Sequence, residues 1–256
     1  MIATRRAVRI VERNALAYRR MWYVFLAGFF EPILFLLSIG VGVGHLVGKL
    51  PGPHGKLFPY QEYVAPGMMA AAAMNGSVLD TTFNFFVKFK YLGTYDTMLA
   101  TPLGILDLAY GEVLWGFLRG AIYAGAFLLT MVAMGLVPSG WAALAVPGSV
   151  LIGFAFGGIG LASTTWMRSF VDFDFVNLAL VPLFLFSATF FPLSRYPGGL
   201  QAVVRVTPLY QGVALERSLV LGDITWSLIP HAFYLVVIGW IGIRVAARRL
   251  GGLLQP

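Results

Sequence analysis

The sequence predicts an all-α membrane protein, a single domain over residues 1–256 with about six transmembrane helices. Hydrophobic residues make up 59% of the chain and charged residues 11%, and the mean hydropathy is +0.80. An ordinary soluble domain has roughly a quarter charged residues. Because so few charges cannot cover this much apolar surface in water, the expected solvent is a lipid bilayer.

Six apolar windows are long enough to cross a bilayer as helices, which takes about 20 residues for about 30 Å of hydrocarbon. They cover residues 23–47, 64–86, 108–136, 144–166, 175–191 and 226–246. The fifth window is the shortest, and Pro182 inside it is expected to kink the helix rather than end it.

Basic residues cluster on one side of these windows. Arginines precede the first window and close the last, Lys88 and Lys90 follow the second, and Arg168 follows the fourth. By the positive-inside rule both termini are expected to be cytoplasmic. The expected location is a bacterial-type cytoplasmic (inner) membrane, which the chain crosses several times.

The first expected element is an amphipathic helix over residues 1–21. On a helical wheel its arginines and Glu12 share one arc, while Ala7, Ile10 and Tyr18 share the other. Such a helix is expected to lie in the inner headgroup layer. The alternative is a disordered tail that only sets the orientation of the chain.

Glycines at four-residue spacing indicate close helix packing, as in Gly40/Gly44/Gly48, Gly116/Gly120 and Gly153/Gly157. The pattern predicts a bundle and no particular function.

The outer connection at 193–225 is too apolar for a soluble loop. Pro208 divides it into two short apolar segments that carry Arg205, Glu216 and Arg217. Neither segment is long enough to span. We expect two short re-entrant helices that keep their charged groups in water. The alternative is a hairpin lying on the membrane surface.

Several polar side chains fall inside the predicted spans. They are Glu31, Asp80, Asn84, Glu112 and Arg119. A charge that faces lipid at mid-depth costs a few kcal/mol, so these groups must face protein or water. Glu112 and Arg119 stand two turns apart, so we expect each to meet another helix. The set forms either a polar inner vestibule or fixed hydrogen bonds between helices.

Enzymatic chemistry is weakly indicated. The chain has no Cys, its three His are isolated, and no phosphate-binding G-x-x-x-x-G-K-[ST] run occurs, so we expect no metal or nucleotide on this chain. The net charge of +7 lies in short blocks beside apolar runs. That placement favours lipid headgroups over nucleic acid as the partner.

The order of several motifs carries a family resemblance. They are EYVAPGMMAAAAMNG at 62–76, KYLGTYDTMLATPLG at 90–104, YGEVLWG at 110–116, FPLSRYP at 191–197 and TPLYQGVALER at 207–217. Together with the basic N-terminus they make the chain resemble permease subunits of ABC exporters of the type-2 family. The nearest branch contains the nodulation lipo-oligosaccharide exporters and the daunorubicin-type drug-resistance permeases.

The resemblance implies that residues 88–103 carry a cytoplasmic coupling helix that docks on a separate ATPase subunit. Its expected contact residues are Lys88, Lys90, Thr94, Tyr95, Asp96, Met98, Leu99 and Pro102. Tyr95, Met98 and Leu99 are expected to enter a groove of the ATPase, with Asp96 at its rim. The alternative is a plain solvated turn.

The resemblance also implies an outer gate in the re-entrant segment, formed by Pro192, Arg205, Pro208, Glu216 and Arg217. It implies two permease subunits, identical or sister chains, and an ATPase dimer that binds ATP and Mg.

The expected function is therefore the permease subunit of an ATP-driven exporter of amphipathic lipid-linked saccharides or hydrophobic drugs. The alternative is an ion-coupled secondary transporter that uses Asp80 and Glu112. An intramembrane enzyme would need clustered catalytic groups, which the sequence does not show.

Overall fold

The computed structural model describes residues 2–19, 22–52 and 55–254, without the side chains at 2–6, 22–29, 31, 32, 35, 41, 96 and 254. The longer helices are α1 (Ile2–Arg19), α2 (Trp22–Val47), α3 (Tyr60–Leu79), α6 (Ile105–Ala133), α7 (Ala145–Thr164), α10 (Pro208–Leu221) and α11 (Leu228–Leu254). The shorter ones are α4 (Phe85–Lys90), α5 (Thr94–Leu99), α8 (Phe173–Leu185) and α9 (Gly198–Val206).

Short turns and one hairpin complete the chain. A π-helical turn, η2 (Asp80–Asn84), joins α3 to α4, and the 3₁₀ turns η3 (Gly140–Leu144), η4 (Phe170–Asp172) and η5 (Leu193–Arg195) precede α7, α8 and α9. Strands β1 (Lys49–Pro51) and β2 (Leu57–Pro59) pair antiparallel, with Leu50 opposite Phe58. The sequence did not predict this hairpin.

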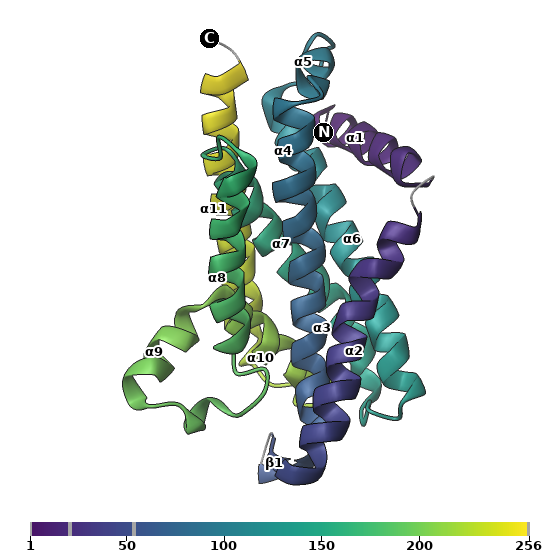
Figure 1. Ribbon diagram of the computed structural model, residues 1–256, viewed down its shortest axis with the longest axis vertical. Coiled ribbons are helices and arrows are strands. Elements are labelled where there is room, and N and C mark those ends of the chain that lie inside the picture. Colours follow the sequence, from purple (N-terminus) through teal and green to yellow (C-terminus); the bar gives the residue numbers. More distant parts are fainter. Residues whose placement is uncertain (1, 20–21, 53–54, 255–256) are drawn as a thin grey trace.

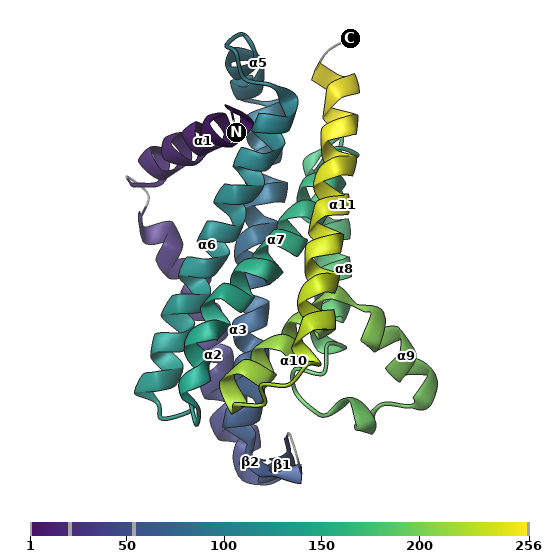
Figure 2. The same ribbon diagram turned by 180° about the vertical axis from the view of Figure 1, so that it is seen from behind.

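The two ends of the molecule differ in what they carry. Helices α1, α4 and α5 and the last turns of α11 lie together at one end, which we call the α5 end (Figures 1 and 2). The β-hairpin, α9 and α10 lie at the other, which we call the α9 end. The first and last described helices therefore reach the same end, and the location of that end in the cytoplasm stays a prediction.

Helix α3 lies at the centre of the bundle because its side chains are small. Residues 63–74 are all buried, and α2, α6, α7 and α10 all contact this helix. Gly120 of α6 faces the Ala73 carbonyl of α3, and Gly153 of α7 faces Phe117 of α6. Small residues allow helix backbones to approach in lipid, where no hydrophobic drive brings them together. The glycine spacing therefore predicted two of these contacts.

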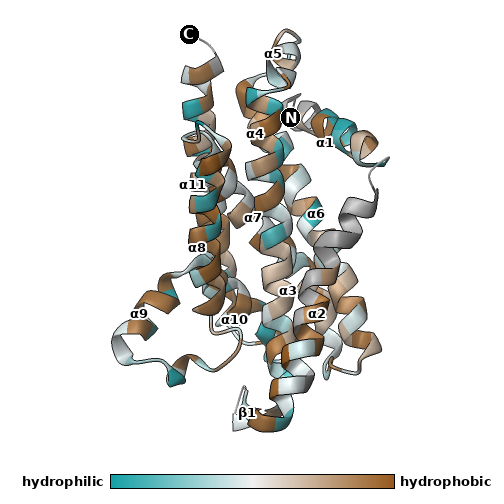
Figure 3. Ribbon diagram, in the orientation of Figure 1, coloured by the Kyte–Doolittle hydropathy of each residue, from teal (hydrophilic) through white to brown (hydrophobic). Residues whose placement is uncertain are grey.

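Three of the described helical segments are long and apolar enough to cross a membrane, namely Ile105–Ala133, Gly140–Thr164 and Leu228–Leu253. Phe175, Leu178 and Phe233 are among the large apolar residues that are exposed. Hydrophobic residues predominate along helices α8 and α11 (Figure 3). The chain is thus mostly helical, as expected of a membrane protein, and the count of about six spans stays a prediction.

The fifth predicted window is only partly helical. Helix α8 has 13 residues, which extend roughly 20 Å and fall short of the about 30 Å hydrocarbon core. Pro182 lies inside α8, and the helix ends at Leu185. Two residues beyond Phe186 the backbone enters the left-handed region at Ala188, where φ is 57°. Residues 186–191, the last third of the window, therefore lie outside the helix.

Helix α1 has one buried face. Ala7, Ile10, Asn14 and Tyr18 recur at three- and four-residue spacing and are buried. Ile10 lies against Gly111 at the start of α6. The predicted amphipathic helix exists, and its apolar face packs on the bundle. Its location in the headgroup layer stays a prediction.

The outer connection forms the two predicted short helices, separated at Thr207. Thr207 caps α10 by accepting a hydrogen bond from the Tyr210 N–H at 3.4 Å, and Pro208 takes the first helical position. Helix α10 packs in the bundle against α3, α7 and α11, whereas α9 projects away from it in both views (Figures 1 and 2). Their insertion into the membrane stays a prediction.

A glycine substitution tests the closest helix crossing. A methyl group at Gly158 of α7 would overlap backbone atoms of Gly239 in α11, whereas one at Gly125 of α6 meets no neighbour within 4 Å. We expect Gly158→Ala to lower the free energy of unfolding by about 1–3 kcal/mol. Thermal unfolding in detergent measures this, with Gly125→Ala as the control. Equal unfolding temperatures for the two variants would contradict the crossing.

Candidate functional site

Buried polar side chains at the α5 end join three parts of the chain. The Arg119 guanidinium of α6 lies 2.7 Å from Asp80 Oδ1 in η2, and the two side chains are 0% and 2% exposed. The Tyr18 hydroxyl of α1 donates to the same oxygen at 3.0 Å, and the Asn84 amide also donates to it. Arg119 Nε donates to Tyr123 at 2.9 Å. A pair of this kind survives burial only because each charge has several partners.

The π-helical turn aligns two of these groups. Asp80 and Asn84 begin and end η2, and the hydroxyls of Thr81 and Thr82 donate back to the carbonyls of Ser77 and Val78 at 2.8 and 2.6 Å. Hydroxyls that bond backward in this way bend helices, and π turns occur often at functional sites. The turn therefore directs both polar side chains toward α1 and α6.

A second ion pair lies nearer the α5 end. Lys88 Nζ of α4 is 2.8 Å from Glu112 Oε2 of α6, and it donates to Asn14 Oδ1 of α1 at 3.1 Å. Asn14 in turn donates to Glu112 at 3.2 Å. Three helices are again tied by one compensated charge pair. We call Asn14, Lys88 and Glu112 the Glu112 cluster.

Helix α5 packs on α4 through Tyr95, beside this cluster. The side chain is 1% exposed, and its ring centroid is 4.8 Å from that of Phe85. Burial, followed by the negative charge of the neighbouring Glu112, raises the pKa of Tyr95. The expectation that Tyr95 enters a groove of a partner is therefore wrong for this conformation, because the ring is already enclosed by its own chain.

Other residues of the coupling region have different positions. Lys90 and Pro102 are exposed, Thr94, Met98 and Leu99 are half-buried, and the side chain of Asp96 lies outside the described residues. Lys88 forms the ion pair with Glu112. The outward surface includes two residues that the sequence did not single out, Leu92 and Thr97. A binding role for this surface stays a prediction.

The predicted intramembrane polar residues thus form two groups. Asp80, Asn84 and Arg119 come together, and Glu112 lies apart with Lys88. As expected, Glu112 and Arg119 each meet another helix. Both carboxylates are paired with cations, which fits fixed hydrogen bonds between helices better than an open vestibule. The side chain of Glu31 lies outside the described residues.

At the α9 end, Arg217 of α10 holds the turn that follows α8. Its Nη2 donates to the carbonyls of Ala188 and Thr189 at 2.8 and 3.2 Å, and its Nε donates to the Tyr63 carbonyl at 3.3 Å. The guanidinium also lies 3.9 Å from the Tyr63 ring centroid. We call this contact the Arg217 clamp. It stabilises the left-handed Ala188, which would otherwise be unfavourable.

The expectation that the charged groups of this segment stay in water is wrong for Glu216, and Arg217 is half-buried. Glu216 is buried and accepts a hydrogen bond from Ser149 of α7 at 2.8 Å, while Arg217 is held by carbonyl oxygens. Because α10 packs into the bundle, these groups face other helices. Arg205 of α9 is exposed, and Pro192 precedes η5 at the start of the connection.

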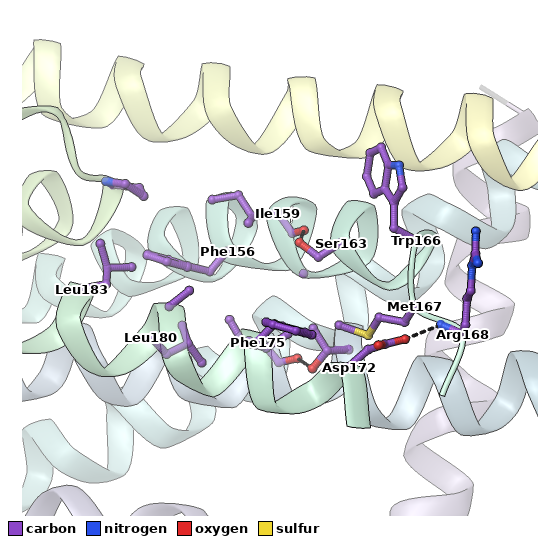
Figure 4. A pocket seen from close by; sticks show the side chains of 16 residues that line it. Phe156, Ile159, Ser163, Trp166, Met167, Arg168, Asp172, Phe175, Leu180 and Leu183 are labelled. Atoms are coloured by element: carbon purple, nitrogen blue, oxygen red, sulfur yellow. Dashed lines mark hydrogen bonds between the residues drawn. The ribbon is translucent and has the colours of Figure 1, made fainter. Parts of the chain in front are cut away.

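Two cavities flank α8, which has no buried residue of its own. One, of about 850 Å³, lies against α2 and α3. The other, of about 620 Å³, lies between α7 and α8, and we call it the α7–α8 groove (Figure 4). Residues that line it include Phe156, Ile159, Ser163, Trp166, Phe175, Leu180 and Leu183.

Four partners escaped the sequence reasoning, namely Asn14, Tyr18 as a hydroxyl donor, Tyr123 and Ser149. Asn14 and Tyr18 share a stripe with Ala7 and Ile10, so a polar group on an apolar helix face was the available signal. No local sequence signal pointed to Ser149, because its partner Glu216 is 67 residues away.

Comparison with known proteins gives a consistent family. The family model of the ABC-2 type transporter matches residues 6–219. Nodulation protein J of Rhizobium leguminosarum bv. trifolii is 29% identical over 251 residues, which cover 95% of this chain and 93% of the relative. Nodulation protein J of Rhizobium meliloti is 28% identical, covering 84% and 81%. The protein of the same name from Bradyrhizobium diazoefficiens is 26% identical, covering 82% and 79%.

The Asp80–Arg119 pair can be tested by a double-mutant cycle. Arg119→Leu leaves a buried carboxylate without its cation, so we expect it to lower the free energy of unfolding by about 3–5 kcal/mol. The double variant Asp80→Leu/Arg119→Leu removes both charges and should lose less than Arg119→Leu alone. Thermal unfolding in detergent measures both, and additive losses would show that the charges are not coupled.

The Arg217 clamp has a matched control in Arg205. Arg217→Met removes the donor to the carbonyls of Ala188 and Thr189 in the turn after α8 and should destabilise the fold by about 1–3 kcal/mol. Arg205→Met removes an exposed charge from the adjacent helix and should change stability by at most about 0.5 kcal/mol. The free energy of unfolding of both variants, measured under the same conditions, tests this. Equal values for the two variants would refute the clamp.

Proposed function

Because the chain belongs to the ABC-2 type transporter family, we propose that it is the permease subunit of an ATP-driven exporter. The motif order at 62–76, 90–104 and 207–217 had suggested this family, and the match over residues 6–219 confirms it. Among amphipathic cargoes, the similarity to proteins named Nodulation protein J favours a lipid-linked oligosaccharide over a hydrophobic drug.

In this proposal the α5 end lies in the cytosol, with the first and last described helices on that side. The distribution of Lys and Arg supports this orientation. ATP and Mg bind a partner ATPase dimer, because the sequence has no phosphate-binding loop. Two permease subunits, identical or sister chains, enclose the path.

The observation that carries the coupling mechanism is the position of Tyr95. Its buried ring packs against Phe85 of α4 beside Glu112, so α5 is not a free loop but is packed on the bundle. A displacement of α5 by a closing ATPase dimer would then reach α1, α4 and α6 together. Packed elements of this kind shift as units rather than deform.

The ATPase would contact the outward side of α5 and of the turn before it. Leu92 is 65% exposed there, and Thr97 is also exposed. At the far end the Arg217 clamp would keep the turn after α8 closed until the bundle moves.

This proposal is tested by Leu92→Arg/Thr97→Arg. Neither residue supports the fold from inside, so the variant should remain folded yet reduce co-purification of the ATPase by at least about tenfold, as for a lost hot spot. The measurements are the amount of ATPase subunit that co-purifies with the tagged chain and the export of a labelled lipo-oligosaccharide into inverted vesicles.

Leu57→Arg is the matched control, because Leu57 is also well exposed but lies in β2 at the α9 end. It should retain the ATPase. Undiminished ATPase binding and export by the Leu92→Arg/Thr97→Arg chain would refute the proposed contact. Transport driven by a proton gradient without ATP would instead support an ion-coupled carrier.

A further inference from the structure

The α7–α8 groove has the length of one bilayer leaflet. Its wall on α7 and the turn that follows runs from Phe156 to Trp166, ten residue steps that extend roughly 15 Å. The hydrocarbon core of a bilayer is about 30 Å thick. The groove is therefore too short for a molecule that crosses the membrane and matches one acyl chain in one leaflet.

The walls and the mouth of the groove differ in polarity. Phe156, Ile159, Phe175, Leu180 and Leu183 give apolar walls toward the α9 end. The opposite end, at the α7–α8 turn, is formed by Trp166, Met167, Arg168 and Asp172 (Figure 4). Tryptophan prefers the boundary between hydrocarbon and headgroups. The groove thus changes from apolar to charged along the direction in which a lipid changes from tail to headgroup.

Two arginines mark the mouth. Arg168 lines it and is exposed. Arg249 of α11 lies over Trp166, with its guanidinium 4.2 Å from the ring centroid, and its Nε donates to Thr165 at 3.1 Å. Arginine is suited to phosphate because its planar group offers several donors. The mouth therefore presents cations at the depth where a lipid phosphate lies.

A carboxylate stands beside these cations. Asp172 Oδ2 accepts hydrogen bonds from the backbone N–H groups of Arg168 and Ser169 at 2.6 and 3.0 Å. These bonds lower the pKa of Asp172, so it is ionised at neutral pH. Asp174 adds a second acidic side chain in the first turn of α8. Balanced charges at one mouth suit a headgroup that carries both signs.

We propose that the α7–α8 groove binds a phosphatidylethanolamine molecule of the cytosolic leaflet. Its phosphate lies toward Arg168 and Arg249, its ammonium group toward Asp172, and one acyl chain along the apolar walls. The site depends on the proposed function only for the assignment of the α5 end to the cytosol. It is separate from the coupling surface at Leu92 and Thr97, so the two proposals fail independently.

The test uses native mass spectrometry of the full-length chain in mixed micelles with phosphatidylethanolamine or phosphatidylglycerol of identical acyl chains. We expect the wild-type chain to retain phosphatidylethanolamine in preference to phosphatidylglycerol. Asp172→Asn keeps an oxygen for the two backbone N–H groups but removes the charge. It should abolish the preference.

Two further pairs of variants separate binding from folding. Ala179→Trp fills the groove and should prevent lipid retention. Leu178, the preceding residue, is 68% exposed and lies outside the groove, so Leu178→Trp should retain the lipid. Arg168→Gln should reduce retention about fivefold, equivalent to about 1 kcal/mol for one arginine near a lipid surface. Arg195→Gln, an exposed arginine at the α9 end, should leave retention unchanged.

Several outcomes would overturn the proposal. Equal retention of the two lipids by the wild-type chain would refute the headgroup assignment. Unchanged retention by Ala179→Trp would show that the lipid binds elsewhere or that a second copy of the chain covers the groove. If Leu92→Arg/Thr97→Arg loses the ATPase but keeps its phosphatidylethanolamine, the site is supported as independent of coupling.

Discussion

The arrangement of the α5 end depends on the buried contact between Asp80 and Arg119. Neither charge is accessible to water, so each must find its compensation within the chain. The Tyr18 hydroxyl and the Asn84 amide complete that compensation, which fixes the position of α1 against η2 and α6. In the Glu112 cluster, nearer the end of the bundle, a buried carboxylate is likewise paired with a cation and α1 is bound through Asn14. An amphipathic helix that could have lain on lipid alone is thereby tied to the transmembrane bundle.

Packing between the helices is uneven, and the unevenness has a physical cause. Alanine and glycine in α3, α6, α7 and α11 let these backbones approach closely, so that part of the bundle behaves as one unit. Helix α8 has large apolar side chains and no buried residue, and cavities lie on either side of it. A rigid core beside a loosely packed helix gives the molecule one place where rearrangement costs little.

The α5 end and the α9 end of the molecule contain different contacts. At the α5 end, the buried Tyr95 ring packs α5 against Phe85 of α4. At the α9 end, the Arg217 clamp holds the turn that ends α8 against α3 and α10. A permease must open one end while closing the other, and these contacts sit where such a motion would begin and finish. The α7–α8 groove adds a lateral surface at which membrane lipid would contact α8 directly.

The sequence by itself determined the membrane class, the family, the amphipathic first helix and the two short helices after Pro197, because composition, periodicity and proline positions act locally. It also determined that Glu112 and Arg119 would need other helices as partners, since burying a lone charge is costly wherever it occurs. Only the tertiary structure decided which partners these are. Lys88 is 24 residues from Glu112, and Asp80 is 39 from Arg119. The inward position of Tyr95, the burial of Glu216, the carbonyl contacts of Arg217 and the early end of α8 were likewise decided by packing. A helix pattern shows which faces are apolar but not which neighbour will cover them.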